Sequence, residues 1–435
     1  MLPDRLTLQP IARFEGTLAL PGSKSLSNRI LLLSALAEGE TEVTRMLESE
    51  DTEVMLAALR KLGVEIGGKP DSGSLRVYGA GGALNAPGRE PVELFLGNAG
   101  TAMRPLTAVL AAGSGTFVLS GVARMHERPI GDLVAGLRQL GARVTCLERE
   151  SYPPLRIEAA GLPGGMARIS GTTSSQFLSA LLMAAPLARE PVTIEITDHL
   201  VSRPYVEMTL ALMARYGVTV ERGEPLRFTV PAGQRYRSPG RVLVEGDASA
   251  ASYFLAGAAI TGGKVRVEGC GSDSIQGDAR FADVLERMGA HTRFEPAAIE
   301  VEGGGPLRGI DADLTAMPDA AMTLAVTALF ARGPTTLRGI ANWRVKETDR
   351  MAAVSSELLK LGARTEVGPD TLVVHPPERI RSASIATYDD HRMAMAFSLA
   401  ACGGQPIVIE NPACVAKTFP EYFAELEHLT VPLRS

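Results

Sequence analysis

Residues 58–66 read ALRKLGVEI, the end of an amphipathic helix followed by a glycine and a β-like run. The pattern returns as GLRQLGARV (136–144), LALMARYGVTV (210–220), VLERMGAHT (284–292) and ELLKLGART (357–365). Its glycines, at intervals of 72 to 78 residues, are Gly63, Gly141, Gly217, Gly289 and Gly362. Glycine after a helix suits the left-handed conformation that ends many helices. A recurrence at this spacing indicates a fold built from repeated units.

A second type of helix alternates with the first and is apolar nearly all round, with polar residues only at its start. Six copies are predicted, at 24–39, 99–113, 173–188, 248–263, 319–333 and 390–404. A helix that is apolar on all sides belongs inside a layer, whereas a helix with one polar face belongs outside. Short β-like runs separate the helices. The chain is therefore predicted to be an α/β (α+β) protein of six βαβαββ units, each of about 70 residues.

The two ends of the chain complement each other in this scheme. Only TVPLRS (430–435) follows the last predicted helix, whereas LTLQPIARF (6–14) and GTLALP (16–21) form a spare pair of strands. We therefore expect two lobes of three units each. One lobe comprises residues 21–245, and the other comprises residues 246–435 completed by residues 1–20.

Composition excludes several classes of protein. The 45% hydrophobic content of the 435 residues is typical of a soluble globular protein, and a net charge of −5 argues against nucleic-acid or anionic-membrane partners. No stretch has the roughly 20 apolar residues of a membrane span, and the first residues contain no signal-like block. A cytoplasmic monomer is expected. The cysteines and histidines have no metal-ligand spacing, so neither a metal nor a cofactor is predicted.

Polar and cationic residues gather where the predicted helices begin. N-capping accounts for many Ser, Thr, Asn and Asp residues there, but not for Lys24 or Arg392, because a cation in the first turn opposes the helix dipole. Free N–H groups with a nearby glycine, Lys or Arg are typical of phosphate or carboxylate sites. The segment NWRVKETDR (342–350) adds five charged residues beside the only tryptophan. A surface salt-bridge network is the alternative there, although exposed pairs contribute little stability.

Common nucleotide and hydrolase motifs are absent from the sequence. GSKS (22–25) has no glycine at position 17 to complete a P-loop, and no G-x-G-x-x-G precedes a predicted helix. There is also no G-x-S-x-G elbow. The sequence therefore does not support ATP, NAD or a nucleophilic serine.

The polar helix starts lie in motifs that resemble the 5-enolpyruvylshikimate-3-phosphate synthase family, of the glyphosate-sensitive bacterial type. The matching segments are LPGSKSLSNR (20–29), LGNAGTAMRPL (96–106), ERPIG (127–131), SSQFLSALLMAAP (174–186), GDASAASYFLAGAAI (246–260), PDAAMTLAVTALFA (318–331), NWRVKETDR (342–350), DDHRMAMAFSLAA (389–401) and KTFPEYF (417–423). The resemblance implies an enolpyruvyl transferase-like fold. It also implies a transferase that moves the enolpyruvyl group of phosphoenolpyruvate to the 5-hydroxyl of shikimate 3-phosphate by addition–elimination, in the shikimate pathway to chorismate and aromatic amino acids.

The same resemblance assigns residues to each substrate. For shikimate 3-phosphate they are Lys24, Ser25, Arg29, Ser174, Ser175, Gln176, Ser202, Asp319, Asn342 and Lys346. For phosphoenolpyruvate they are Lys24, Asn98, Gly100, Arg128, Gln176, Arg350, Arg392 and Lys417. Arg203 and Tyr205 are weaker candidates beside Ser202. Gly100 and Pro105 imply inhibition by glyphosate.

The reaction itself requires two acid–base groups. The 5-hydroxyl must lose a proton while the methylene carbon of phosphoenolpyruvate gains one, and the same carbon must then give up a proton as phosphate leaves. Asp319 is the expected base, and Glu347 is the expected acid at carbon. Lys24 is a rival for the hydroxyl proton, and His391 is a further candidate.

Two alternatives stay open at this point. A sibling family transfers enolpyruvyl to UDP-N-acetylglucosamine, but it usually carries a reactive cysteine in a loop that here reads GVARMHERPIG (121–131). A non-catalytic anion-binding repeat protein would not need the two carboxylates of Asp319 and Glu347.

Overall fold

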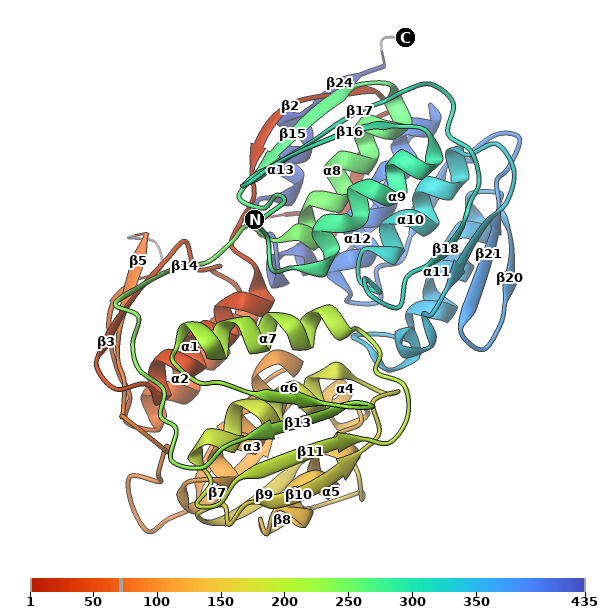
Figure 1. Ribbon diagram of the computed structural model, residues 1–435. Coiled ribbons are helices and arrows are strands. Elements are labelled where there is room, and N and C mark those ends of the chain that lie inside the picture. Colours follow the sequence, from red (N-terminus) through yellow and green to blue (C-terminus); the bar gives the residue numbers. More distant parts are fainter. Residues whose placement is uncertain (1, 70–72, 434–435) are drawn as a thin grey trace. The chain divides into compact units, whose positions relative to one another are not determined.

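The computed structural model describes residues 2–69 and 73–433, and the chain divides into two compact units (Figure 1). The central unit is Gly22–Val244. The terminal unit is Met1–Pro21 with Glu245–Ser435, so it contains both ends of the chain. Each unit is described by itself.

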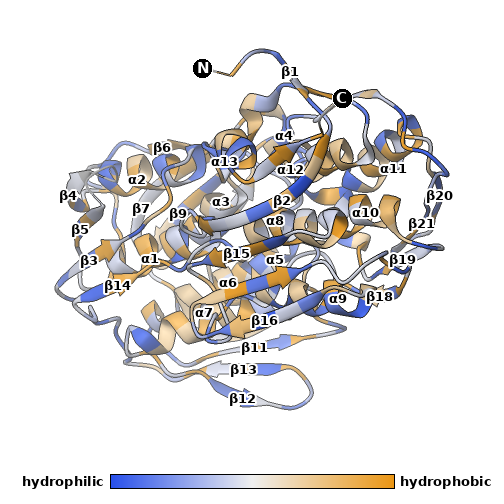
Figure 2. Ribbon diagram, turned by 90° about the horizontal axis from the view of Figure 1, so that it is seen from above, coloured by the Kyte–Doolittle hydropathy of each residue, from blue (hydrophilic) through white to orange (hydrophobic). Residues whose placement is uncertain are grey.

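Buried inner helices form the interior of both units. In the described residues they are α1 (Lys24–Leu36), α3 (Gly100–Ala111) and α6 (Ser175–Ala184) of the central unit, and α8 (Ala248–Thr261), α10 (Ala321–Thr327) and α12 (His391–Ser398) of the terminal unit. Short 3-10 turns continue three of them: η2 (Ala185–Leu187), η4 (Ala328–Phe330) and η6 (Leu399–Gly403). Small side chains allow close packing along α8, whose apolar residues are visible in Figure 2. A Cβ on Gly257 of α8 would lie 2.6 Å from the Phe14 ring, so only glycine permits this approach.

Outer helices with one polar face cover the inner ones. They are α2 (Glu50–Lys61), α5 (Gly131–Gln139), α7 (Arg203–Arg215), α9 (Phe281–Met288), α11 (Arg350–Lys360) and α13 (Tyr422–His428). The five glycines that end the repeated motif have φ between +82° and +119°, which confirms their prediction as helix-ending residues. The remaining short helices are α4 (Ala123–His126), η3 (Gly277–Arg280), η5 (Ala341–Val345) and η7 (Pro412–Lys417).

The described strands form six small sheets, three in each unit. The central unit contains β14 (Arg241–Leu243)-β3 (Glu40–Thr44)-β5 (Ser74–Tyr78)-β4 (Glu65–Lys69), β6 (Val92–Phe95)-β7 (Ser114–Ser120)-β9 (Leu155–Ala160)-β8 (Val144–Cys146), and β10 (Gly165–Ile169)-β11 (Val192–Ile196)-β13 (Arg227–Val230)-β12 (Glu221–Gly223). The terminal unit contains β16 (His291–Glu295)-β17 (Ala298–Glu302)-β15 (Lys264–Glu268)-β2 (Ile11–Ala19)-β24 (Thr430–Pro432), β18 (Asp311–Asp313)-β19 (Thr335–Arg338)-β21 (Thr371–His375)-β20 (Arg364–Val367), and β1 (Arg5–Leu8)-β23 (Ile407–Glu410)-β22 (Ala383–Ile385). Each sheet has one parallel pair, and its other pairs are antiparallel.

The amino-terminal strands belong to sheets of the carboxyl-terminal part of the chain. β1 pairs antiparallel with β23. β2 lies between β15 and β24 (Figure 1). Similarly, β14 at the end of the central unit pairs with β3 near its beginning.

The predicted α/β fold of repeated units with buried inner helices is confirmed. Among residues 2–69 and 73–433, none of the helices is long and apolar enough to cross a membrane.

Candidate active site

The starts of α1, α2 and α3 meet in the central unit. Lys24 Nζ lies 3.4 Å from Asp51 Oδ2, and their side chains are only 8% and 2% exposed. Thr101 Oγ1 donates a hydrogen bond to the same carboxylate oxygen at 3.4 Å and accepts one from Asn28 Nδ2 at 2.7 Å. Lys24 is therefore a buried cation held by a carboxylate that the sequence did not single out.

Gly100 begins α3 between two guanidinium groups. A Cβ at this position would lie 2.7 Å from Arg104 Nη1 and 2.9 Å from Arg128 Nη2. Arg128 Nη1 donates to both the main-chain and side-chain oxygens of Asn98 at 3.0 Å. Two buried cations beside a helix N-terminus favour a bound anion, because charge and dipole act in the same direction.

Arg29 ties α1 to α7 in the same unit. Its Nε donates to Thr209 Oγ1 at 2.8 Å, and its Nη1 donates to the carbonyl of Ser25 at 2.9 Å. Burial lowers the pKa of Arg29 to about 10 despite the opposing effect of Tyr205, so the group stays cationic at neutral pH. Ser202 precedes α7 with a left-handed φ of +53°. Arg203 is instead exposed and pairs with Glu207 at 3.3 Å.

The predicted serine cluster lies at the start of α6. Ser174 Oγ accepts the Gln176 backbone N–H at 3.2 Å, so Ser174 is an N-cap as well as a candidate ligand. The Ser175 side chain is buried, and Gln176 is half-buried. Capping therefore explains Ser174 here, but not the neighbouring polar residues.

Asp319 is the centre of a charged cluster in the terminal unit. Its carboxylate accepts Arg350 Nη1 at 2.8 Å and Arg392 Nη2 at 3.0 Å, and Lys346 Nζ lies 3.4 Å away. Burial acts to raise the pKa of Asp319, but Arg392, Lys346 and Arg350 hold it well below the usual range. Asp319 is therefore ionised at neutral pH.

Arg350, at the first position of α11, joins three carboxylates. Besides Asp319 it binds Glu347 Oε2 at 2.9 Å and Asp390 Oδ2 at 2.8 Å. Although burial acts to lower the pKa of Arg350, Asp390, Glu347 and Asp319 raise it above the ordinary value. His391 is also buried, with Nδ1 3.5 Å from Asp390 Oδ1.

The segment 342–350 is held against the residue before Asp319. The Trp343 indole is fully buried, and its Nε1 donates to the Pro318 carbonyl at 2.7 Å. Lys346 and Glu347, at 24% and 10% exposure, face the Asp319 cluster, so the surface salt-bridge alternative is wrong for them. Asn342 is buried nearby in η5, and Lys417 is buried at the end of η7, which packs on α12.

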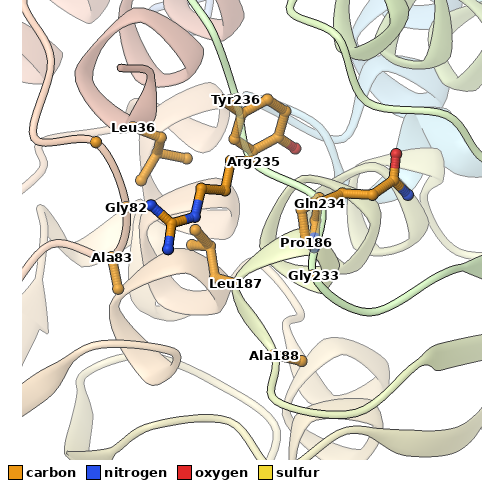
Figure 3. A pocket seen from close by; sticks show the side chains of 11 residues that line it. Leu36, Gly82, Ala83, Pro186, Leu187, Ala188, Gly233, Gln234, Arg235 and Tyr236 are labelled. Atoms are coloured by element: carbon orange, nitrogen blue, oxygen red, sulfur yellow. The ribbon is translucent and has the colours of Figure 1, made fainter.

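A cavity of about 300 Å³ in the central unit contains none of these candidate residues (Figure 3). Its lining includes Leu36 at the end of α1, Leu187 in η2, and Arg235 with Tyr236 in the segment before β14. Leu36 is the last residue of α1, and Leu187 lies in the turn that continues α6, so the cavity is at the opposite end of both helices from Lys24 and the serine cluster.

The comparison with protein families decides between the alternatives left open by the sequence. A family described as EPSP synthase (3-phosphoshikimate 1-carboxyvinyltransferase) matches residues 8–426. The chain belongs to the EPSP synthase family. The non-catalytic repeat protein and the sibling transferase are therefore not favoured.

Relatives within the EPSP synthase family match almost the whole chain. The 3-phosphoshikimate 1-carboxyvinyltransferase of Nitrosomonas europaea is 59% identical over 98% of both chains. The chloroplastic enzyme of Arabidopsis thaliana is 56% identical over 98% of this chain and 85% of its own. The solved EPSP synthase of Acinetobacter baumannii superposes with a TM-score of 0.81 at 28% identity, covering 98% of each chain. The enolpyruvyl transferase NikO of Streptomyces tendae, at 19% identity and a TM-score of 0.79, has the same fold.

Three residues that contact the predicted site residues are not themselves predicted from the sequence: Asp51, Arg104 and Asp390. Asp51 resembles any acidic residue in the first turn of a helix, so the sequence gives no separate signal for it. Arg104 follows Gly100 by four positions, and this helical spacing could have identified it. The sequence predicts Asp390 only as the start of a helix, whereas it both caps α12 and binds Arg350.

Proposed function

We propose that this protein transfers the enolpyruvyl group of phosphoenolpyruvate to the 5-hydroxyl of shikimate 3-phosphate and releases phosphate. The observation that carries the proposal is the Asp319 cluster, in which two carboxylates suited to proton transfer lie among three buried or half-buried cations. Both proposed substrates are polyanions, and an acidic protein with a net charge of −5 needs such local cations to bind them.

The substrate contacts carried over from the family remain proposals for each unit. In the central unit, shikimate 3-phosphate would contact Lys24, Ser25, Arg29, Ser174, Ser175, Gln176 and Ser202, and phosphoenolpyruvate would contact Lys24, Asn98, Gly100, Arg128 and Gln176. In the terminal unit, shikimate 3-phosphate would contact Asp319, Asn342 and Lys346, and phosphoenolpyruvate would contact Arg350, Arg392 and Lys417. Gly100 and Arg128 support the phosphoenolpyruvate assignment. A Cβ on residue 100 would lie 2.9 Å from Arg128 Nη2, so the Arg128 guanidinium can hold this position only because residue 100 is glycine.

Addition requires a base for the 5-hydroxyl and an acid at carbon. In the proposal, Asp319 takes the hydroxyl proton as the 5-oxygen bonds to C2 of phosphoenolpyruvate, and Glu347 protonates C3. Elimination then removes a proton from C3, breaks the C2–O bond to phosphate and restores the double bond. Lys24 and His391 are the other candidates for proton transfer, and the cations stabilise charge on the departing phosphate.

The charge balance around Asp319 suggests how its basicity changes during the reaction. Without substrate, Arg392, Lys346 and Arg350 depress its pKa, which makes it a poor base. Anionic phosphoenolpyruvate bound to Arg350 and Arg392 would compete for those cations and raise the pKa of Asp319. Base strength would then increase only after substrate is bound.

The direct experiment mixes the protein with both substrates and identifies the products by mass spectrometry. We expect the 5-enolpyruvyl ether and inorganic phosphate in equal amounts. A folded protein that binds both substrates yet forms no ether would contradict the proposal.

We also propose that glyphosate inhibits the enzyme and that the enzyme works as a monomer in the cytoplasm. Gly100 supports inhibition, because the guanidinium groups of Arg104 and Arg128 lie within 3 Å of where a side chain at this position would begin. All four cysteines, which lie in the described residues, are free thiols, as is common in a reducing compartment. Inhibition kinetics, cell fractionation and light scattering test the three points separately.

A further inference from the structure

The loop between β22 and α12 contains two consecutive residues in an unfavourable backbone conformation. Tyr388 has φ +53° and Asp389 has φ +56°, and neither is glycine. Residues other than glycine rarely adopt this conformation, and it persists only where the surrounding structure enforces it. The next residues are Asp390, which binds Arg350, and Arg392, which binds Asp319. The strain therefore lies directly before residues of the charged cluster.

Helix α11 holds this loop at two points. At its first residue, Arg350 donates to Asp390 at 2.8 Å and 3.3 Å. Glu357 follows seven residues later, about two turns along the same face of the helix. Glu357 Oε1 accepts the Tyr388 hydroxyl at 2.8 Å, and Oε2 accepts the Ala386 backbone N–H at 3.1 Å. The left-handed turn lies between these two attachments.

The bonding of Glu357 is more extensive than charge neutralisation requires. Its side chain is fully buried, whereas its ion-pair partner Lys360, at 2.7 Å, is 44% exposed. A pair with Lys360 alone could form at the surface, where burying a carboxylate would not be necessary. The loop explains why the Glu357 carboxylate is buried, because each of its oxygens accepts a hydrogen bond from a loop residue, Tyr388 or Ala386. Asn411 adds a third attachment by donating to Asp389 Oδ1 at 3.1 Å.

We infer that Glu357 and Tyr388 are positioning residues, which hold the turn at Tyr388 and Asp389 so that Asp390 meets Arg350 and Arg392 meets Asp319. The inference rests on the proposed function only for its kinetic consequence. Because Arg350 and Arg392 are assigned to phosphoenolpyruvate, loosening the turn should weaken binding of that substrate. Binding of shikimate 3-phosphate should be weakened less, because most of its assigned contacts, including Ser174, Ser175 and Ser202, lie in the central unit.

The variant Tyr388→Phe tests this by removing a single hydroxyl. Ser355→Ala is the matched control, because Ser355 also lies on α11 and its hydroxyl bonds to Thr365 at 2.6 Å, away from the loop. We expect Tyr388→Phe to raise KM for phosphoenolpyruvate about tenfold, equivalent to about 1.4 kcal/mol, and to raise KM for shikimate 3-phosphate much less. Glu357→Gln should give a rise of the same kind. The double variant should be no worse than the poorer single variant, because the Tyr388–Glu357 hydrogen bond is shared by the two residues.

Amide hydrogen exchange gives a second readout that does not depend on turnover. We expect residues 386–392 to exchange at least tenfold faster in Tyr388→Phe than in the parent protein, and Ser355→Ala to leave them unchanged. Unchanged exchange in Tyr388→Phe and Glu357→Gln would overturn the inference even if the parent protein had no transferase activity. Equal rises in both KM values, with a lower melting temperature, would also overturn it by indicating a general structural role.

Discussion

Arg350 and Asp390 form a fully buried ion pair between the first residue of α11 and the residue that caps α12. Arg350 Nε lies 2.8 Å from Asp390 Oδ2, and the two side chains are 1% and 0% exposed. Asp390 also accepts the Arg392 backbone N–H at 3.0 Å. The pair therefore fixes two helix starts at once, and both carry cations that contact Asp319.

Removing the charge of Asp390 should destabilise the protein strongly. Asp390→Asn leaves the buried Arg350 short of one anion, and we expect a loss of about 3 kcal/mol, at the low end of the usual range because Asp319 and Glu347 remain. Urea unfolding at pH 7 measures the loss. The control is Asp311→Asn, which breaks an exposed pair with Arg338 at 2.6 Å and should change stability little. Equal losses in the two variants would contradict the importance of burial.

Removing the carboxylate of Asp319 should affect turnover more than binding. We expect Asp319→Asn to lower kcat by about 100-fold or more while shikimate 3-phosphate still binds, because general-base catalysis typically contributes that much. Steady-state kinetics and calorimetry measure the two effects. Asp313→Asn, an exposed change six residues earlier, should leave both unaltered. Near-normal kcat in Asp319→Asn would exclude Asp319 as the base.

Asp278 should make stability fall as the pH rises. Burial and the nearby charge of Asp319 raise the pKa of Asp278 to about 6, against the opposing effects of the Ser249 hydroxyl and Arg392. A carboxyl group whose folded-state pKa is raised stabilises the protein below its unfolded value of about 4, and this contribution is lost as pH rises through about 6.

The variant Asp278→Asn isolates this effect. We expect it to be more stable than the parent protein by about 3 kcal/mol at pH 8, with the difference vanishing near pH 4. Thermal unfolding across this pH range measures it. Asp283→Asn, on the outer helix α9, serves as the control and should show no such pH-dependent gain. A constant difference at every pH would rule out titration of Asp278 as the cause.

A methyl group on Gly100 should interfere with the anion site of the central unit. Gly100→Ala must displace the Arg104 and Arg128 guanidinium groups, which are flexible side-chain ends and can move. We expect KM for phosphoenolpyruvate to rise about tenfold, KM for shikimate 3-phosphate to stay constant, and glyphosate inhibition to weaken. Gly88→Ala, where a Cβ would meet no atom within 4 Å, is the control. Parallel changes in both KM values would contradict the assignment.

Much of the fold could be predicted because its signals are local. Each inner helix is apolar within a single stretch, and each glycine such as Gly63 follows its helix directly. The pairing of β14 with β3 depends on strands about 200 residues apart, and nothing in either strand specifies the register. The site also combines features with local signals and contacts between distant segments. Lys24 and Arg392 could be identified as cations in a first turn, but the partnership of Lys24 with Asp51 exists only after three helix starts have been brought together.

Phosphate release from phosphoenolpyruvate tests the central claim most directly. The protein is incubated with phosphoenolpyruvate and, in separate reactions, with shikimate 3-phosphate, with UDP-N-acetylglucosamine or with no acceptor. We expect release that depends on shikimate 3-phosphate and saturates with it, and background release in the other two reactions. Release with the sugar nucleotide alone, or equal release without any acceptor, would contradict the proposed transfer to shikimate 3-phosphate.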